Sequence, residues 1–393
     1  MELSGKLKEK LLDRLDITRN LSDEELYDII TSMVMEEYQD RQISLKGKLR
    51  ISRELFHSIR GLDVMQEILD DESVTEIMVN GYDHIFIEKQ GKLFRYPGVF
   101  SSREKLSDII QIIVGRANKR VNEASPIVDT RLPDGSRVNV VLDPVAVNGP
   151  VITIRKFPKT AMSMEDLLSL GSITKEAGAF LKKLVKNGYN IFISGGTGSG
   201  KTTFLNALCG YIPEDERVIT IEDSAELKIF GIENLVSMEC RPANAEGENE
   251  ITIRDLIRTS LRMRPTRIIV GEVRGAEALD MLQAMNTGHD GSLSTGHGNS
   301  PSDMLSRLET MVLMGCEMPL SAIRAQIVSA IDVMVHLERF RDGSRKVVEI
   351  TELYGMENGA IRLSPLFLYK SSEGETGQLV ATGNTLHTRK QHR

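Results

Sequence analysis

The sequence NIFISGGTGSGKTTFLNAL, residues 190–208, decides the fold of the second half of this chain. A short apolar run of β type is followed by a glycine-rich segment with the pattern G-x-x-x-x-G-K-[ST] and then by a helical run. In such a loop, glycines let several backbone N–H groups point at phosphate oxygens, at a helix N-terminus whose dipole also favours anions. The segment therefore predicts a strand–loop–helix unit that binds a nucleoside triphosphate.

Consecutive residues form the predicted phosphate loop and the first turn of its helix. They are Gly195, Gly196, Thr197, Gly198, Ser199, Gly200, Lys201, Thr202 and Thr203. Lys201 would place a cation at the β- and γ-phosphates, and the Thr202 hydroxyl can ligate Mg²⁺. A glycine-rich turn without a ligand is the alternative, but the complete motif between a strand and a helix favours binding. We therefore expect a nucleoside triphosphate and Mg²⁺ as ligands.

The chain around this loop alternates between helical and β-type patterns. One helical face, with the spacing i, i+3, i+4, i+7, i+8, is formed by Ala177, Phe180, Leu181, Leu184 and Val185. The β-branched runs RVITIE, RIIVG and SLST follow, separated by helical stretches, and beyond residue 332 an Asp342-Gly343 turn signals a hairpin. This order predicts an α/β fold with a mostly parallel sheet that is covered on both faces.

Acidic residues follow two of the expected strands, at the position where open α/β sheets bind their ligands. Glu222, Asp223 and Glu226 come at or after the end of RVITI, and Glu272 comes after RIIVG. Gly271 stands where a Walker B strand usually has aspartate, so the magnesium-side carboxylate must be Glu272 or come from elsewhere. Each acid alone is more often a cap or a surface charge. Downstream of an intact phosphate loop, they predict the acidic part of a site that hydrolyses a nucleoside triphosphate.

Two histidines lie in the segment TGHDGSLSTGH, which follows the Walker B strand. A lone histidine is usually a hydrogen-bonded polar residue, but His289 and His297 in this Gly/Ser/Thr-rich context can sense the γ-phosphate or transmit its loss. Their spacing does not match HExxH, so zinc catalysis is not expected.

Changes of pattern define the expected domains. They are a helical N-terminal segment (residues 1–50), an α+β domain (51–157), a linker (158–164), the α/β domain (165–380) and a polar tail (381–393). Ser22 and Glu25 form a capping-box signature in the first segment. In the second, Asn80-Gly81 between apolar runs signals a hairpin. A helical face in the same domain is formed by Leu106, Ile109, Ile110, Ile113 and Val114.

Composition limits the classes of function. Of 393 residues, 49 are Lys or Arg and 56 are Asp or Glu, a formal net charge of −7 that gives no reason to expect a nucleic-acid coat. Cys209, Cys240 and Cys316 are far apart, so neither a disulfide framework nor a cysteine zinc site is expected. Because no apolar run approaches about 18 residues and the N-terminus lacks a signal-peptide pattern, we expect a soluble, cytosolic chain without a transmembrane segment.

Four segments together resemble the secretion ATPases of type II, type IV and conjugative systems. GGTGSGKTT is similar to the Walker A motif of that family, ITIEDSAEL to its aspartate box, RIIVGEVR to its glycine-containing Walker B motif and TGHDGSLSTGH to its histidine box. Within the family, the similarity is greatest to assembly ATPases of tight-adherence (Tad/Flp) pili. The segments of that branch are SVTEIMVNGYDHIFIEKQGKL, PIVDTRLPDGSRVNVV, GPVITIRKF and LERFRDGSRKVVEITELYGM. The resemblance covers about residues 55 to 370.

The resemblance implies a homo-hexameric ring in which each subunit holds ATP between a PAS-like N-terminal domain and a RecA-like C-terminal domain. It assigns phosphate-contacting roles to Arg137 and Arg155 of the N-terminal domain, with Arg131 as a further candidate. It also implies that Glu222 orients the attacking water and Glu272 lies on the magnesium side, acting through a water molecule, although the sequence alone leaves the roles of the two acids open.

The resemblance further implies a motor that powers pilus assembly or protein secretion. Such a motor works on platform proteins of the inner membrane and is cytoplasmic, peripheral at the inner face of the cytoplasmic membrane, without direct nucleic-acid binding. The alternatives are a conjugative, DNA-linked secretion ATPase and a nucleotide-gated regulatory module.

Overall fold

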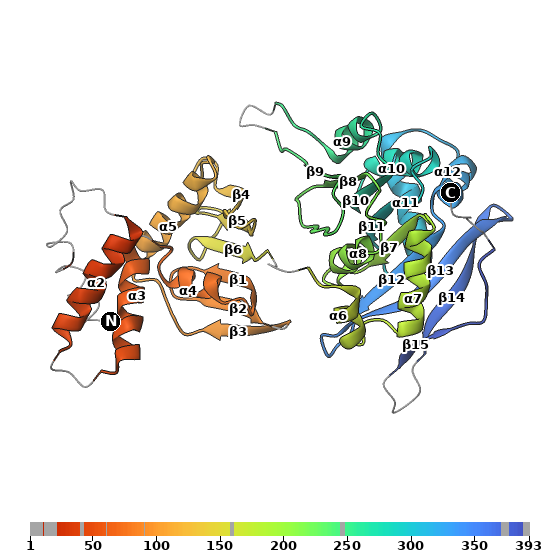
Figure 1. Ribbon diagram of the computed structural model, residues 1–393. Coiled ribbons are helices and arrows are strands. Elements are labelled where there is room, and N and C mark those ends of the chain that lie inside the picture. The colour runs from red at the N-terminus through yellow and green to blue at the C-terminus, as the bar shows by residue number, and fades with distance from the viewer. Residues whose placement is uncertain are drawn as a thin grey trace. The chain divides into compact units, whose positions relative to one another are not determined.

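The computed structural model describes residues 11, 22–39, 43–59, 61–89, 91–157, 161–243, 248–370 and 377–387. The chain forms two compact units, Met1–Pro158 and Lys159–Arg393 (Figure 1). The start of the predicted linker (158–160), the end of the predicted tail (388–393) and parts of the predicted N-terminal segment lie outside the described residues.

The first unit begins with a pair of helices, α2 (Asp23–Glu37) and α3 (Leu45–Ile59). The predicted capping box starts α2: Ser22 Oγ accepts a hydrogen bond from Glu25 N at 3.2 Å, and Glu25 Oε2 accepts one from Ser22 N at 2.9 Å. The two helices share an apolar cluster that includes Leu26, Ile30 and Leu55. Residues 23–37 and 45–59 of the first unit are therefore helical.

An antiparallel sheet follows, formed by described strands in the order β3-β2-β1-β6-β5-β4. Its strands are β1 (Val74–Asn80), β2 (Ile85–Lys89), β3 (Lys92–Tyr96), β4 (Ile127–Arg131), β5 (Arg137–Val141) and β6 (Val151–Arg155). Helices α4 (Val64–Asp70) and α5 (Arg103–Arg116) contribute to its core, and the predicted apolar face of α5 is buried. The hairpin predicted at Asn80-Gly81 joins β1 to β2, with Gly81 at φ +80°.

The second unit contains a larger sheet in the order β15-β14-β13-β12-β7-β11-β10-β8-β9. Its strands are β7 (Ile191–Gly195), β8 (Val218–Glu222), β9 (Leu235–Glu239), β10 (Arg267–Val273), β11 (Leu293–His297), β12 (Val333–Arg339), β13 (Arg345–Glu357), β14 (Ala360–Lys370) and β15 (Gln378–Ala381). Neighbours from β12 to β9 pair in parallel, and β13 to β15 extend the sheet with antiparallel pairs. The predicted parallel strands and the late hairpin are thus confirmed.

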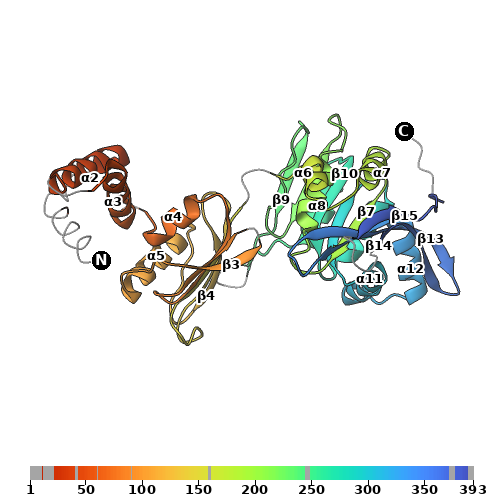
Figure 2. The ribbon, with the colours of Figure 1, turned by 90° about the horizontal axis from the view of Figure 1, so that it is seen from below.

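Helices cover both faces of this sheet (Figure 2). One cluster contains residues of α6 (Met164–Ser169), α7 (Lys175–Lys186) and α8 (Lys201–Cys209). The other contains residues of α9 (Ile253–Ser260), α10 (Glu277–Asn286), α11 (Pro301–Gly315) and α12 (Leu320–Ala330). Within β7 the side chains alternate, since Ile191 and Ile193 belong to the first cluster and Phe192 to the second.

Residues after β15, which the sequence assigns to a polar tail, still contact the sheet. The buried carboxylate of Glu352 accepts hydrogen bonds from His387 N at 2.9 Å, and the His387 ring stacks on Tyr354 with a centroid separation of 4.1 Å. No described helix is by itself both long and apolar enough to span a bilayer. Helices α11 and α12 meet that criterion only as a pair, and they are bent by 117°.

Candidate nucleotide site

The phosphate loop lies between the end of β7 and the start of α8, as the sequence predicts. Gly198 (φ +71°) and Gly200 (φ +92°) adopt left-handed backbone conformations that side chains other than glycine rarely take. Gly200 is the N-cap residue of α8, so the loop runs directly into a helix N-terminus. Backbone N–H groups at such a terminus form an anion-binding site.

The ammonium group of Lys201 is folded over the loop. Its Nζ donates to the carbonyl oxygens of Gly195 and Gly196, both at 3.1 Å, and contacts His297 Nδ1 at the same distance. Lys201 is only 7% exposed, so its charge is held inside the site. The loop is thereby connected to the end of β11, where His297 lies.

His297 connects Lys201 to Glu272. Its Nε2 lies 2.8 Å from Glu272 Oε1. Burial lowers the pKa of His297, and the nearby charges of Lys201 and Arg274 act in the same direction against the opposing effect of Glu272. A neutral imidazole can accept a hydrogen bond from Lys201 at Nδ1 and carry its proton at Nε2, facing the carboxylate.

Arg274, which sequence reasoning did not single out, extends this chain of contacts. Its Nη2 donates to Glu272 Oε2 at 3.0 Å, and this hydrogen bond is the main cause that raises the pKa of Arg274. The structure therefore joins Lys201, His297, Glu272 and Arg274 in one polar chain that runs from the start of α8 across the ends of β11 and β10. Arg274 lies inside the quoted Walker B segment, so the motif did contain a signal for it.

Glu222 has a different environment. It is 4% exposed, and its carboxylate accepts hydrogen bonds from Glu226 N at 2.9 Å and Leu227 N at 3.2 Å. A β-carbon at Gly271 would lie 2.9 Å from Glu222 Cγ. The glycine in the Walker B strand thus makes room for the Glu222 side chain, and that carboxylate holds the loop that follows β8.

The donor set around the loop fits Mg²⁺. Glu272 Oε1 is buried and no donor reaches it in hydrogen-bond geometry, although His297 Nε2 is close. Thr202 is the second residue of α8, so its hydroxyl is the other oxygen that the motif offers. Among the described residues, no three His, Cys, Asp or Glu side chains cluster as a metal site. Mg²⁺ characteristically takes few protein ligands and completes its shell with phosphate and water.

The sequence model of one protein family matches residues 60–359, and that family is described as type II/IV secretion system protein. The chain belongs to this family. The match confirms the resemblance to secretion ATPases. The closer similarity to the tight-adherence branch stays a prediction.

Two relatives of this secretion-system protein are similar to it over most of their length. A putative conjugal transfer protein of Mycobacterium tuberculosis is 32% identical over 343 residues, which are 86% of this chain and 96% of the relative. The type IV secretion system protein VirB11 of Brucella suis is 33% identical over 318 residues, 74% of this chain and 88% of VirB11.

Solved structures show the same fold. The ATPase DotB of Legionella pneumophila has a TM-score of 0.55 at 24% identity, covering 75% of this chain and 80% of that chain. The pilus retraction motor PilT has a TM-score of 0.52 at 18% identity, covering 82% and 83%. The predicted fold class, a RecA-like P-loop domain with a smaller N-terminal domain, is confirmed, and as a member of this family the chain is an ATPase.

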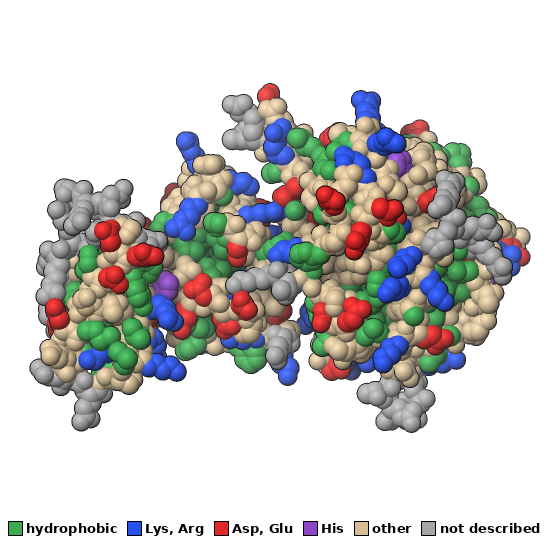
Figure 3. All heavy atoms as spheres, viewed as in Figure 1, with side chains coloured by type: hydrophobic (Ala, Val, Ile, Leu, Met, Phe, Trp, Pro, Cys, Tyr) green, Lys and Arg blue, Asp and Glu red, His purple; other side chains and the backbone are tan. Residues whose placement is uncertain are grey.

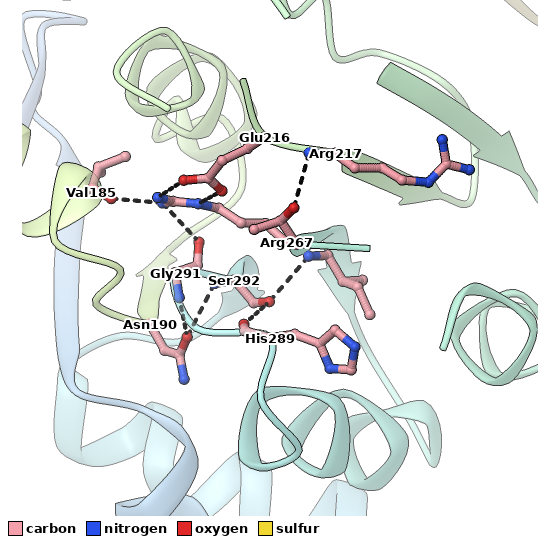
Figure 4. Close-up of polar contacts among 10 residues, drawn as sticks. Val185, Asn190, Glu216, Arg217, Arg267, His289, Gly291 and Ser292 are labelled. Carbon is pink, nitrogen blue, oxygen red and sulfur yellow. Dashed lines mark hydrogen bonds and ion pairs between the residues drawn. The ribbon is translucent and has the colours of Figure 1, made fainter. Parts of the chain in front are cut away.

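The structure of this secretion ATPase does not place His289 at the phosphate loop. His297, the last residue of β11, pairs with Gly195 at the end of β7, whereas His289 precedes the start of β11. His289 therefore lies at the opposite end of the parallel strands, where its carbonyl accepts a hydrogen bond from Ser292 Oγ (Figure 4). Its Nδ1 contacts the Ala284 carbonyl at 3.0 Å. The prediction that His289 binds the nucleotide is corrected accordingly.

A buried polar network connects the elements at this end of the parallel strands (Figure 4). Arg267, 2% exposed, donates from Nε and Nη2 to the two carboxylate oxygens of Glu216, at 2.5 and 2.6 Å. Its Nη1 donates to the Val185 carbonyl at 2.7 Å. Gly291 has φ +84°, and a β-carbon there would lie 2.5 Å from Arg267 Nη1. Sequence reasoning missed this network because its members come from separate segments.

A second histidine beside the phosphate loop was also not predicted. His336 Nδ1 lies 2.8 Å from Ser194 Oγ, and the two residues pair across β12 and β7. His336 is 3% exposed, and burial is the largest cause that lowers its pKa. Its hydrogen bond with the backbone of Asn299 acts in the opposite direction and connects it to the segment after His297.

In the first unit, the predicted arginines stand in one row. Arg131 on β4 pairs with Arg137 on β5, and Arg137 pairs with Arg155 on β6. Directly opposed residues of antiparallel strands point to the same face. The row continues to Glu76 on β1, whose Oε1 lies 3.8 Å from Arg155 Nε. The side chain of Arg155 is 62% exposed.

Proposed function

We propose that this chain hydrolyses Mg²⁺-ATP at residues 195–203 and is a motor that powers pilus assembly or protein secretion across the cell envelope. The observation that carries the proposal is the polar chain from Lys201 through His297 to Glu272. It connects the loop that would hold the phosphates to a carboxylate on a neighbouring strand, so loss of the γ-phosphate would alter contacts on β7, β11 and β10 together.

Each residue of the site then has a chemical role. The backbone N–H groups of the loop and Lys201 hold the β- and γ-phosphates. Thr202 and, through a water molecule, Glu272 would hold Mg²⁺, which neutralises charge on the phosphates. His297 lies between Lys201 and Glu272 and holds both side chains in position. For Glu222 to act as the base, its carboxylate would have to exchange its hydrogen bonds from Glu226 and Leu227, so we propose that Glu272 also orients the attacking water.

We further propose that Arg137 and Arg155 contribute positive charge to the triphosphate during hydrolysis. Directly opposed residues of antiparallel strands point to the same face, so an anion at that face would meet the guanidinium groups of both Arg137 and Arg155. Such arginines are worth about 10³–10⁵ in rate in other phosphoryl-transfer enzymes. Arg131, at the end of the same row, is the third candidate.

The proposed working form is a homo-hexamer, peripheral at the inner face of the cytoplasmic membrane, that acts on platform proteins of that membrane. The relatives named as a type IV secretion system protein and a pilus retraction motor support an envelope machine. The tight-adherence pilus is the system we propose, because four further segments of the chain, among them PIVDTRLPDGSRVNVV and GPVITIRKF, resemble the assembly ATPases of such pili.

A conjugative system is the second candidate, because several relatives are described as conjugal transfer proteins. On the face shown in Figure 3, acidic and basic side chains are interspersed and form no continuous basic surface. DNA-stimulated turnover with a steep salt dependence would favour this candidate, since counterion release makes DNA binding strongly salt-dependent.

Steady-state hydrolysis of Mg²⁺-ATP by the full chain tests the main proposal. We expect turnover by the wild type and its loss in Lys201→Ala, with Lys186→Ala, a lysine in the last turn of α7, as the control. Equal rates for the wild type and Lys201→Ala would refute the assignment of the site. Native mass measurement with and without a nonhydrolysable ATP analogue tests the hexamer.

A further inference from the structure

The hairpin between β12 and β13 brings two arginines to the phosphate loop. They lie on the side of the loop that carries the Gly198 carbonyl, which we call its outer side. Arg339 ends β12, Arg345 begins β13, and the two residues are paired. Hydrogen bonds within the turn between them define its conformation. Phe340 N donates to Ser344 O at 2.8 Å, and Asp342 Oδ1 accepts from Ser344 N at 2.9 Å. The arginines are therefore presented by a defined element of the sheet.

Both side chains lie beside the two left-handed glycines of the loop. Arg345 Nε donates a hydrogen bond to the Gly198 carbonyl at 2.9 Å. A β-carbon at Gly200 would lie 3.4 Å from Arg345 Cδ, and one at Gly198 would lie 3.5 Å from Arg339 Nη1. Because like charges opposite each other are unfavourable on a sheet, the pairing of the two arginines does not by itself stabilise this arrangement. The hydrogen bond from Arg345 to the loop does.

We propose that Arg345 is a positioning residue of the nucleotide site, whose hydrogen bond to the Gly198 carbonyl holds the phosphate loop in its binding conformation. A peptide unit is planar and trans, so its C=O and N–H point in opposite directions. Anchoring the Gly198 carbonyl on the outer side therefore directs the N–H of Ser199 to the inner side. In this structure that N–H makes a 3.3 Å bond to Gly196 O within the loop, which a phosphate oxygen can replace.

This inference rests on the proposed function, and nucleotide binding tests it without requiring turnover. The probe is a fluorescent methylanthraniloyl-ATP with Mg²⁺, titrated into the full chain at fixed salt. Arg345→Met removes the donor and the charge while it keeps an unbranched side chain of several carbons. We expect the dissociation constant to rise about 10-fold, as for the loss of a hydrogen bond made by a charged group. In hydrolysis assays, KM should rise in proportion and kcat should change much less.

Arg345→Gln separates the hydrogen bond from the charge. The side-chain nitrogen of glutamine stands at the same distance along the chain as Arg Nε, so it can donate to the Gly198 carbonyl without a positive charge. We expect Gln to recover most of the lost affinity. Arg341→Gln is the matched control for charge. Arg341 is exposed in the same turn, and its substitution removes one positive charge, as Arg345→Gln does.

The outcomes separate this inference from the proposed function. Wild-type affinity in Arg345→Met, equal losses in Arg345→Met and Arg345→Gln, or equal losses in Arg345→Met and Arg341→Gln would each overturn the positioning role. Failure of the wild type to bind the probe, or binding by Lys201→Ala that equals the wild type, would refute the nucleotide site itself.

Discussion

The side chain of Glu222 fills the space that any side chain at residue 271 would need. A β-carbon at Gly271 would stand 2.9 Å from Glu222 Cγ and 3.5 Å from Glu222 Oε2. The Glu222 carboxylate in turn accepts hydrogen bonds from the backbone of Glu226 and Leu227. The departure from a usual Walker B aspartate is therefore a packing requirement: glycine on β10 lets a buried carboxylate on β8 hold the next loop.

The first prediction concerns that packing. Gly271→Ala should destabilise the second unit by about 1–3 kcal/mol through overpacking, and Gly271→Asp should cost more because it buries a second carboxylate beside Glu222. Thermal unfolding measures both. In a Glu222→Ala background, the added cost of Gly271→Ala should be much smaller, since the crowding atoms are gone. Additive effects of the two changes would contradict the explanation.

The sequence was sufficient for the strand–loop–helix unit because the phosphate loop is local: its glycines, lysine and flanking elements are contiguous. His297 and Glu272 could be proposed for the same reason, because both lie at or near the ends of strands that the sequence shows. His289 was expected at the phosphate loop because it shares a segment with His297. A strand runs between the two histidines, so they lie at opposite ends of that strand. Arg345 and His336 were missed because only the order of strands in the sheet brings β12 beside β7.

The second prediction separates the two acids. Glu272→Gln should keep ATP binding but lower turnover by two or more orders of magnitude, an effect of the size expected for a lost catalytic carboxylate. Glu222→Gln should lower the unfolding temperature of the second unit, because the amide is a weaker acceptor for Glu226 N and Leu227 N. Turnover per folded molecule should change less than for Glu272→Gln. The reverse order of the two rates would restore Glu222 as the base.

The third prediction concerns the arginine row of the first unit. Arg137→Gln and Arg155→Gln should each lower kcat by at least about 10³ if these side chains stabilise charge in the transition state. Arg95→Gln is the control, since Arg95 is an exposed arginine on β3 of the same sheet, outside the row. Loss of turnover in the control to the same extent would show that general charge, and not the row, is responsible.

The fourth prediction is a pH dependence of stability from His336. Its folded-state pKa is lowered by burial, so its stabilising contribution is present above the unfolded value of about 6.5 and is lost as pH falls through the lowered pKa. His336→Gln, which cannot titrate, should be less stable than wild type at pH 7.5, and the difference should narrow at pH 5.5. Ser194→Ala, which keeps the imidazole, should retain the wild-type slope. A difference that widens on acidification would contradict this sign.

The last prediction concerns the buried ion pair of Arg267 and Glu216, which lies at the end of the parallel strands away from the phosphate loop. Arg267 bonds both carboxylate oxygens of Glu216 and is 2% exposed, so removing one partner leaves a charge without its counterion in a region closed to water. Glu216→Gln and Arg267→Met should each destabilise the second unit, by about 3–5 kcal/mol for a fully uncompensated charge. The double variant Arg267→Met/Glu216→Leu should recover part of that loss, because replacing a whole buried pair by apolar groups is often nearly neutral. Denaturant unfolding measures the three variants.

If the double variant lost the sum of the two single losses, the pair would not be coupled. The network in Figure 4 would then have to be stabilised mainly by the backbone contacts of Arg267 with Val185 and Gly291.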